Sequence, residues 1–360
     1  MADNKQLKKV LVAMSGGVDS SVTALLLKDE GYEVTGVTMK LWVDCGGAKG
    51  PDHVQSILSD AQKAAETIDV EHFIVDAEDQ FYRQVVNDFT AAYRSGKTPN
   101  PCVICNHEVK FALLLSEARR RNIPWIATGH YARVECDSKT GSCRLLKAVD
   151  DKKDQSYMLY RLTQAELAAV LLPLGRMTKD EVKKVAWNAG IHGVNRPESQ
   201  EICFIPDNDY RSFLERIETV QGGEGDIVDR QGNVLGRHQG IAYYTVGQRK
   251  GLGITSPHPL YVCHIDSDKN LIVVGEVNDL YSKGLLAGEM NYISGLPPAG
   301  PLEVKVKIRY RAKPVEAILY PEKENKAKII FSEKQKAVTP GQSAVLYRDD
   351  EVVGGGIIES

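Results

Sequence analysis

Two cysteines three positions apart, Cys102 and Cys105, lie in the stretch TPNPCVICNHEVKF at residues 98–111. This spacing occurs in zinc clips, redox pairs, iron–sulfur ligand sets and sulfur-transferring sites. A zinc clip needs two more ligands, but the sequence has no second cysteine pair of this spacing, and His107 is too close to complete a set alone. Cys203, in the stretch ESQEICFIP, is the natural third thiol. The pattern therefore leaves a metal site and a thiol-based reaction both open.

The other four cysteines show no pattern that indicates chemistry. The chain holds seven cysteines in 360 residues, and an odd count in a large chain argues against a framework of structural disulfides. Cys136 and Cys143 flank the polar turn DSKTG. We expect both to be incidental surface or packing thiols, and we expect the same of Cys45 and Cys263.

A glycine- and serine-rich loop, SGGVDSS at residues 15–21, separates the apolar run KVLVAM from a segment with helical spacing. Gly16 and Gly17 let backbone N–H groups approach a phosphate, and the start of the following helix adds partial positive charge. The serine hydroxyls can donate hydrogen bonds, and Asp19 can bind the Mg²⁺ of a pyrophosphate group. A simple turn that ends a strand is the alternative, since the loop lacks the lysine of the GxxxxGK[ST] pattern.

The complete string after KVLVAM resembles the pyrophosphate-binding loop of the ATP pyrophosphatases, which adenylate a carbonyl oxygen and release pyrophosphate. Such an enzyme then needs a nucleophile that displaces AMP. A cysteine sulfur can serve, because thiolates are strong nucleophiles when their pKa is lowered. Two cysteines can divide this work: one carries a persulfide, and the other liberates its sulfur by forming a disulfide.

The segments around the loop predict the sheet that must position it. Strand, loop, helix and strand follow one another over residues 9–39, with Gly31 after the helix, and this unit begins a parallel, doubly wound sheet. Thr178 and Glu181 form a capping-box pattern at the start of a helix that Gly190 ends. The remaining expected elements of this part are helices at 53–69, 77–96 and 106–121 and strands at 72–77 and 123–130.

The length of 360 residues exceeds what one hydrophobic core usually serves. The composition and the spacing of apolar residues change twice along the chain. We expect an ATP-pyrophosphatase catalytic domain at 1–207, which belongs to the adenine nucleotide alpha hydrolase-like α/β class. A small, mainly β central domain rich in glycine turns is expected at 208–283. A C-terminal β-barrel is expected at 284–360, where period-two patterns are separated by turns.

The stretch LEVKVKIRYR in the expected barrel alternates apolar and basic residues. A solvated outer face of the barrel is one interpretation, and a stripe that follows RNA phosphates is the other. The alternation predicts Tyr310 on the apolar face, toward the core. The opposite, basic face holds Lys305, Lys307, Arg309 and Arg311.

The net charge is −3, so any contact with nucleic acid must come from local basic patches rather than from overall charge. The apolar runs are too short to span a bilayer. The start MADNKQLKKV lacks the apolar core of a secretory signal. We therefore expect a cytoplasmic protein with no membrane partner.

Eight ordered blocks spread over the whole chain resemble the tRNA-specific 2-thiouridylase family. They are AMSGGVDSS, TPNPCVICNHEVKF, ATGHYAR, KKDQSYML, ESQEICFIP, YTVGQRKGLGI, KIRYRAKP and VTPGQSAVLY. The resemblance implies an α/β ATP-pyrophosphatase domain, a small central domain and a C-terminal β-barrel. It also implies ATP-dependent conversion of the wobble uridine in the anticodon arm of tRNA to 2-thiouridine. ATP, used with Mg²⁺, adenylates O2 of uracil, sulfur attacks C2, and AMP leaves.

The resemblance also assigns residues. Cys105 matches the family nucleophile, and Cys203 matches the cysteine that carries the persulfide. Asn100, Pro101 and Cys102 match the segment that meets the target base. The positions that match ATP contacts are Ala13, Met14, Ser15, Gly16, Gly17, Val18, Asp19, Ser20, Met39 and Gly129. The positions that match other tRNA contacts are His130, Lys153, Asp154, Gln155, Arg309, Tyr310 and Gln342.

This chain departs from the family at Cys102, where many members have an aspartate that can act as general acid or base. A thiol serves that role poorly unless its pKa is shifted. Cys102, Cys105 and Cys203 could instead hold a 4Fe–4S cluster through three thiolates and leave one iron free for sulfide. The persulfide relay and the cluster both stay open. So does the sulfur donor, which could be a persulfide relay protein, a cysteine desulfurase or free sulfide.

Two other classes of protein remain as rivals. A ligase of another kind that uses the same loop, such as an amidating or tRNA-lysidine-type enzyme, would not need Cys105 or Cys203. A non-catalytic RNA-binding protein with a metal clip would not need the SGGVDSS loop.

Overall fold

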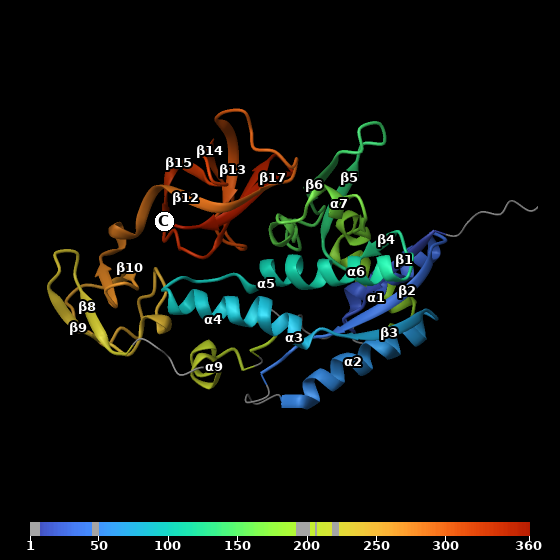
Figure 1. Cartoon of the computed structure of the whole chain (residues 1–360), viewed down its shortest axis with the longest axis horizontal. Coiled ribbons are helices and arrows are strands. Elements are labelled where there is room, and N and C mark those ends of the chain that lie inside the picture. The colour runs from blue at the N-terminus through green and yellow to red at the C-terminus, as the bar shows by residue number, and fades with distance from the viewer. Residues whose placement is uncertain (1–7, 45–49, 192–201, 206, 218–222) are drawn as a thin grey trace, which may run out of the picture.

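The computed structural model describes residues 8–44, 50–191, 202–205, 207–217 and 223–360 (Figure 1). Cys45, for which the sequence predicts an incidental role, lies outside the described residues. Figure 1 shows a parallel sheet with its helices at one end of the longest axis and a small β-rich part at the other. A barrel lies next to the helices between these two parts.

A five-stranded parallel sheet organises the N-terminal part. In spatial order its strands are β3 (Glu71–Asp76), β2 (Glu33–Lys40), β1 (Lys9–Ala13), β4 (Trp125–Ala127) and β7 (Val170–Leu171). Every neighbouring pair is parallel, which confirms the predicted doubly wound α/β fold. The strand order reverses between β1 and β4, and sheets of this kind bind their ligands outside the carboxyl ends of the strands at such a point.

Both faces of the sheet are covered, because alternate residues of β1 pack into different cores. Leu11 lies in a cluster with Phe111 and Leu114 on one side. Val10 and Val12 pack on the other side with residues of two helices, α1 and α8. The main helices of this part are α1 (Val18–Asp29), α2 (Gly50–Thr67), α6 (Ala112–Arg120) and α8 (Lys179–Asn188).

The ends of two helices agree with the sequence. Thr178 and Glu181 form the predicted capping box of α8, in which each side chain bonds to the other residue's backbone N–H. Gly31 and Gly190 follow α1 and α8 with φ of +85° and +68°, as expected for residues that end a helix.

The predicted start of the helix after the cysteine pair is wrong. Helical structure begins at Pro101 rather than at residue 106, because proline at the first helical position has no N–H to lose and already has the required φ. The chain then runs without a break through α5 (Pro101–Ile104), the π-helical η2 (Cys105–Phe111) and α6. Both cysteines of the pair therefore lie within a helix. The preceding helical run consists of α3 (Glu78–Phe81), η1 (Tyr82–Val86) and α4 (Asn87–Arg94).

A closed barrel forms the C-terminal part, since β12 pairs with both β15 and β17. Its strands are β12 (Tyr281–Tyr292), β13 (Leu302–Lys307), β14 (Val315–Pro321), β15 (Ala327–Lys336), β16 (Ser343–Arg348) and β17 (Glu351–Ile358). The predicted alternation holds in β13, where Val304 and Val306 are buried and Lys305 is exposed. The strand ends at Lys307, however, so Arg309 and Tyr310 lie in the following turn.

A hairpin from the N-terminal part extends the barrel sheet. It consists of β5 (Ala132–Cys136) and β6 (Cys143–Lys147), and Leu146 pairs with Glu351 of β17. Cys136 and Cys143 are opposite each other across the hairpin and form a disulfide, so the expectation of two incidental thiols is wrong. The hairpin register brings their Cα atoms within 4.0 Å, which the cysteine count cannot indicate.

The central part is a four-stranded sheet whose spatial order is β10-β11-β8-β9. Its strands are β8 (Gly225–Val228), β9 (Val234–His238), β10 (Tyr261–Asp266) and β11 (Leu271–Gly275). The remaining helical elements among the described residues are η3 (Ser156–Leu159), α7 (Gln164–Leu167), η4 (Pro173–Arg176), α9 (Tyr210–Ile217), η5 (Ile241–Tyr243) and η6 (Val277–Leu280). None of the described helices combines the length and apolarity needed to cross a membrane.

Candidate active site

The glycine- and serine-rich loop lies between β1 and α1, at the point where the strand order reverses. Gly16 has φ of +73°, and Ser15 and Gly17 are exposed. Ser20 Oγ accepts a bond of 3.1 Å from the Ser15 N–H and donates one of 3.0 Å to the Gly17 carbonyl. Ser21 Oγ donates to the same carbonyl at 3.0 Å. The loop is thus fixed from within while its outer side stays open to a ligand.

Other positions that the resemblance assigns to ATP lie around this loop. Gly129 follows β4, and a Cβ at this position would come within 2.9 Å of the backbone of Asp19 and Ser20. Only glycine permits that close approach. Thr38 of β2 donates a bond of 2.7 Å to the carbonyl of Met14, the residue directly before the loop. Met39 follows Thr38 in the same strand.

Asp19 is held by two residues that the sequence does not single out. Lys179 Nζ lies 2.7 and 2.8 Å from the two carboxylate oxygens, and the Tyr131 hydroxyl donates to one of them at 2.9 Å. Lys179 is the first residue of α8, and its side chain is only 12% exposed. The capping box at the start of α8 can be seen in the sequence. The contact between Lys179 and Asp19 cannot, because the two residues are 160 positions apart.

The three thiols come from two distant segments. Cys105 is buried, whereas Cys102 and Cys203 reach the surface. Phe204 packs edge-on against the rings of Phe81, Phe89 and Phe213, with centroid separations of 5.5, 5.4 and 5.5 Å. Cys105 belongs to the same cluster of side chains. The aromatic packing therefore brings the segment of Cys203 to the helix that carries Cys105.

Lys110 provides the positive charge of this thiol site. Protein atoms crowd all three sulfurs, and the resulting desolvation raises the pKa of each thiol above its ordinary value, in Cys203 to about 12. The Lys110 ammonium opposes this rise in every case. Burial acts to lower the pKa of Lys110 itself, but its interactions with the thiols raise that pKa overall. The thiols are thus uncharged at neutral pH, with a cation already in place to stabilise a thiolate.

His130 links the thiol site to the phosphate loop. It follows Gly129 directly, its ring stacks on Phe111 at 5.9 Å between centroids, and its Nδ1 lies 2.8 Å from the Thr128 hydroxyl. Burial, with a smaller contribution from Lys110, lowers the pKa of His130 to about 3. The imidazole is therefore neutral at physiological pH and can contact a ligand by hydrogen bonds but not as a cation.

Several positions that the resemblance assigns to tRNA lie at the contact between the N-terminal part and the barrel. The Tyr310 hydroxyl donates to the Asp154 carbonyl at 3.1 Å, and the Tyr310 ring is partly buried against the core, as the alternation predicts. The Asp154 carboxylate is 8% exposed and accepts bonds of 3.1 Å from the N–H groups of Ala148 and Ser156.

The other predicted tRNA positions also have protein partners in this conformation. Gln155 accepts a bond from the Tyr131 N–H at 2.9 Å. Gln342 donates to the carbonyls of residues 98 and 99, and Arg309 donates to the carbonyls of residues 336 and 337. Lys153 is partly exposed at the same side of the interface.

The described residues show no assembled set of metal ligands at the thiols. Within the described part of the chain, no group of three or more His, Cys, Asp or Glu side chains is placed to hold a metal ion. A magnesium ion that arrives with a nucleotide is held mainly by phosphate oxygens, and the loop can offer it only Asp19, whose two oxygens now contact Lys179.

The parallel sheet, the phosphate loop at its reversal point and the adjoining thiols define an ATP-pyrophosphatase-type α/β protein with two β-rich parts. Family models match the chain in the same order. Residues 8–207 match "tRNA methyl transferase HUP domain", residues 211–276 match "tRNA methyl transferase PRC-barrel domain", and residues 282–358 match "Aminomethyltransferase beta-barrel domain".

Curated relatives extend over the full length. Proteins named tRNA-specific 2-thiouridylase MnmA from Clostridioides difficile (strain 630) and Geotalea uraniireducens (strain Rf4) are each 47% identical to this chain. The first alignment covers 98% of both chains, and the second covers 100% of this chain and 97% of the relative. A relative from Caldanaerobacter subterraneus, named tRNA-specific 2-thiouridylase MnmA 1, is 48% identical over 98% of both chains. The chain belongs to the tRNA-specific 2-thiouridylase family.

The raised thiol pKa values predict slow alkylation in the free protein. Because only the thiolate reacts, the rate at Cys203 should keep rising with pH beyond pH 10, well past the range of a free cysteine near pH 8.5. The measurement is iodoacetamide labelling between pH 6 and about pH 10.5, with each cysteine quantified by mass spectrometry.

Lys110→Met should slow labelling of Cys203 at each pH by about 3- to 10-fold, since loss of the cation raises the thiol pKa further. Lys139→Met, in the exposed turn of the β5–β6 hairpin, serves as the matched control. A wild-type rate that levels off near pH 8 would contradict this description of the site.

Proposed function

We propose that this protein is an ATP-dependent tRNA sulfurtransferase that converts the wobble uridine of tRNA to 2-thiouridine. The observation that carries the proposal is the placement of two remote cysteines, Cys105 and Cys203, in one cluster beside a phosphate loop. His130 spans the two halves, since it follows the glycine that packs on the loop and interacts with the lysine that faces the thiols. Nucleotide activation and sulfur transfer can therefore act on one base.

The first half of the reaction uses the phosphate loop. O2 of uridine attacks the α-phosphorus of ATP, the α–β bond breaks, and pyrophosphate leaves. The start of α1 and the backbone of Gly16 and Gly17 offer N–H groups to the phosphates. Lys179 lies within bonding distance of Asp19, so an incoming phosphate can take over its ammonium while Asp19 turns to the metal. Magnesium supplies charge neutralisation when it is bound with the nucleotide.

The second half uses the thiols. The outer sulfur of a persulfide on Cys203 attacks C2 of the adenylated base, and AMP leaves with the former O2. The Cys105 thiolate then attacks the inner sulfur, forms a disulfide with Cys203 and leaves the outer sulfur on the base as a thiocarbonyl. A thiol reductant must reduce the disulfide, and a persulfide donor must then transfer its outer sulfur to Cys203, before the next cycle. Lys110 stabilises the thiolates that these steps require.

Cys102 stands where an acid or base could meet the target base, next to Asn100 and Pro101. Its thiol is uncharged at neutral pH, because the protein atoms around the sulfur desolvate it and raise its pKa, although the residue reaches the surface. We assign it the role of a neutral proton donor rather than that of a base. It occupies the position of the family aspartate, but at neutral pH it lacks the negative charge of an aspartate.

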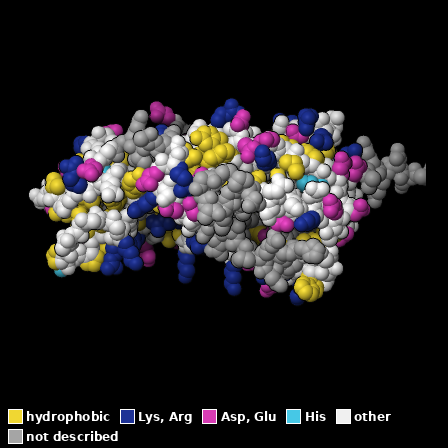
Figure 2. Space-filling view, turned by 90° about the horizontal axis from the view of Figure 1, so that it is seen from below, with side chains coloured by type: hydrophobic (Ala, Val, Ile, Leu, Met, Phe, Trp, Pro, Cys, Tyr) yellow, Lys and Arg dark blue, Asp and Glu magenta, His cyan; other side chains and the backbone are white. Residues whose placement is uncertain are grey.

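The RNA surface is proposed to include basic groups of both β-rich parts. On the face seen in Figure 2, Lys and Arg side chains gather near the end of the molecule that holds β8–β11, while Asp and Glu side chains are scattered more widely. Arg237, Arg249 and Lys250 of that part are exposed. Anticodon bases are single-stranded and can turn into a pocket while basic groups hold the phosphates, as this chemistry requires. The division into domains at 1–207, 208–283 and 284–360 remains part of this proposal.

Loss of either catalytic thiol should abolish sulfur transfer. Cys105→Ser or Cys203→Ser is expected to lower 2-thiouridine formation by at least about 10³-fold, because a hydroxyl can neither carry a persulfide nor close a disulfide. ATP binding should stay within about twofold of wild type, since neither side chain belongs to the phosphate loop. The product is measured by mass spectrometry of nucleosides from an unmodified tRNA transcript.

Cys263→Ser is the matched control, because Cys263 lies on β10 outside the thiol cluster and should leave thiolation unchanged. Thiolation at the wild-type rate in Cys105→Ser or Cys203→Ser would disprove the thiol mechanism. About four irons per chain in protein purified without oxygen would favour the cluster alternative instead.

Lys179→Met should slow tRNA-dependent pyrophosphate release by about 10²-fold or more, as expected when a fixed positive group at a developing charge is lost. Lys179→Arg should retain part of the rate because the charge remains. The release of pyrophosphate is followed with a coupled assay at saturating ATP and tRNA.

Lys183→Met, an exposed position on the same helix α8, is the control and should behave like wild type. If Lys179→Met releases pyrophosphate as fast as this control, the ammonium serves only to hold Asp19 and takes no part in activation.

A further inference from the structure

A turn of the barrel is hydrogen-bonded to the segment that precedes α5, the helix that carries Cys102. This segment, residues 95–100, connects α4 to α5. The Thr98 N–H donates a bond of 2.8 Å to the Pro340 carbonyl. Gln342 Nε2 donates to the carbonyls of Thr98 and Pro99 at 3.0 and 3.2 Å. Three hydrogen bonds across the two parts therefore fix the two residues directly before Asn100.

The contact is so close that it depends on a glycine in the barrel. Gly341 has φ of +91°, and a Cβ at this position would lie 2.8 Å from the Thr98 oxygen and 2.9 Å from the Thr98 nitrogen. Both of these are backbone atoms, which cannot move aside as the tip of a side chain can. Any other residue at 341 must therefore push the connecting segment away from the barrel.

The turn is itself firmly placed. The Gly341 N–H donates to the Ile358 carbonyl, and the Ile358 N–H donates to the Gln342 carbonyl, both at 2.8 Å. The next residue, Ser343, accepts a bond of 2.8 Å from the buried Tyr157 hydroxyl through its carbonyl. The barrel thus offers a rigid reference against which the connecting segment is positioned.

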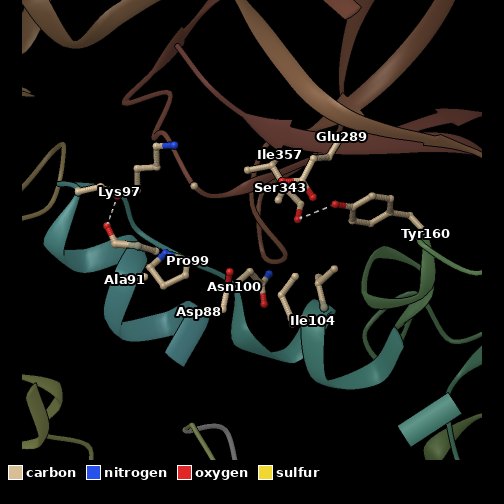
Figure 3. Close-up of a pocket in the computed structure, with 14 residues that line it drawn as sticks. Asp88, Ala91, Lys97, Pro99, Asn100, Ile104, Tyr160, Glu289, Ser343 and Ile357 are labelled. Atoms are coloured by element: carbon tan, nitrogen blue, oxygen red, sulfur yellow. Dashed lines mark hydrogen bonds between the residues drawn. The ribbon is translucent and has the colours of Figure 1, made fainter. Parts of the chain in front are cut away.

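Figure 3 shows the surroundings of the connecting segment. A cavity of about 240 Å³ lies between the helices and the barrel next to the turn, with Pro99 and Asn100 on one side and Ser343 and Ile357 on the other. Pro99 is buried at the edge of this cavity. The hydrogen bonds at Thr98 and Pro99 join this part of the segment directly to the barrel.

We propose that the turn Pro340–Gln342 is a positioning clamp for sulfur transfer: it fixes the start of α5 and thereby the place of Cys102 and Cys105. Gly341 and Gln342 are positioning residues, which act through Thr98 and Pro99 and not on the base. Both N–H groups of the Gln342 amide are used in the clamp, so only its oxygen is left for RNA in this conformation. This inference rests on the proposed function.

The test compares Gly341→Ala with Gly295→Ala in the full-length protein. Gly295 also has positive φ, +82°, but no atom within 4 Å of the added Cβ, so it controls for backbone strain alone. The readouts are amide exchange at Thr98 without tRNA, the single-turnover rate of thiolation at saturating ATP and tRNA with persulfide-loaded enzyme, and the Kd for tRNA.

Gly341→Ala should speed Thr98 exchange at least about 10-fold and slow the single-turnover step by about 10- to 100-fold, as expected for misplacement by a fraction of an ångström to one ångström. The Kd for tRNA should stay within about twofold of that of Gly295→Ala. A purely structural role would instead lower the folded fraction and leave the rate per folded molecule unchanged.

Equal single-turnover rates in Gly341→Ala and Gly295→Ala would overturn the clamp. If Gly341→Ala does not fold, Gln342→Glu decides the question, because a carboxylate cannot donate to the two carbonyls and should give the same loss of rate at saturating tRNA. If the wild-type protein makes no 2-thiouridine, the proposed function fails, and Thr98 exchange alone then decides whether the turn holds the segment.

Discussion

The packing of Phe204 among three aromatic rings is the contact on which the candidate active site depends. Cys203 and Cys105 are 98 positions apart in sequence, so their segments meet only through tertiary packing. The ring of Phe204 is almost completely buried, and the cluster it enters also contains Cys105. Burial of an aromatic side chain contributes several kcal/mol, about the conformational-entropy cost of fixing the backbone of two to four residues. The position of a reactive sulfur is thus set by its apolar neighbour.

The electrostatics of the site follow from that burial. Desolvation keeps the thiols protonated, while the positive charge of Lys110 stabilises whichever sulfur loses its proton. At the other half of the site, Lys179 neutralises Asp19 until a more highly charged phosphate group can compete for it. Each half therefore holds a cation before substrate binds: Lys110 faces the thiols, and Lys179 faces Asp19 until the phosphates compete for it. Such an arrangement lowers the cost of reorganisation in the transition state.

Local patterns in the sequence predict much of this structure, and long-range contacts account for what they miss. The strand of residues 9–13, the capped helix α8 and the alternation in β13 follow from periodicity and capping residues, which act over a few positions. The phosphate loop and the three thiols lie in recognisable sequence motifs. The family that these motifs resemble is also the family of the full-length relatives. The Cys136–Cys143 disulfide and the Lys179–Asp19 pair depend on register or tertiary packing, so no local string reveals them. The earlier start of α5 follows instead from a local signal, the proline at its first position.

In the proposed reaction the base oxygen itself is adenylated and then replaced by sulfur. The most direct measurement uses a tRNA whose wobble uridine carries ¹⁸O at O2, with ATP, magnesium and persulfide-loaded enzyme. Mass spectrometry of the released AMP then reports where that oxygen goes. One ¹⁸O atom is expected in AMP for each 2-thiouridine formed. Unlabelled AMP together with full conversion to 2-thiouridine would contradict this reaction, because the oxygen would then have left the base by another route.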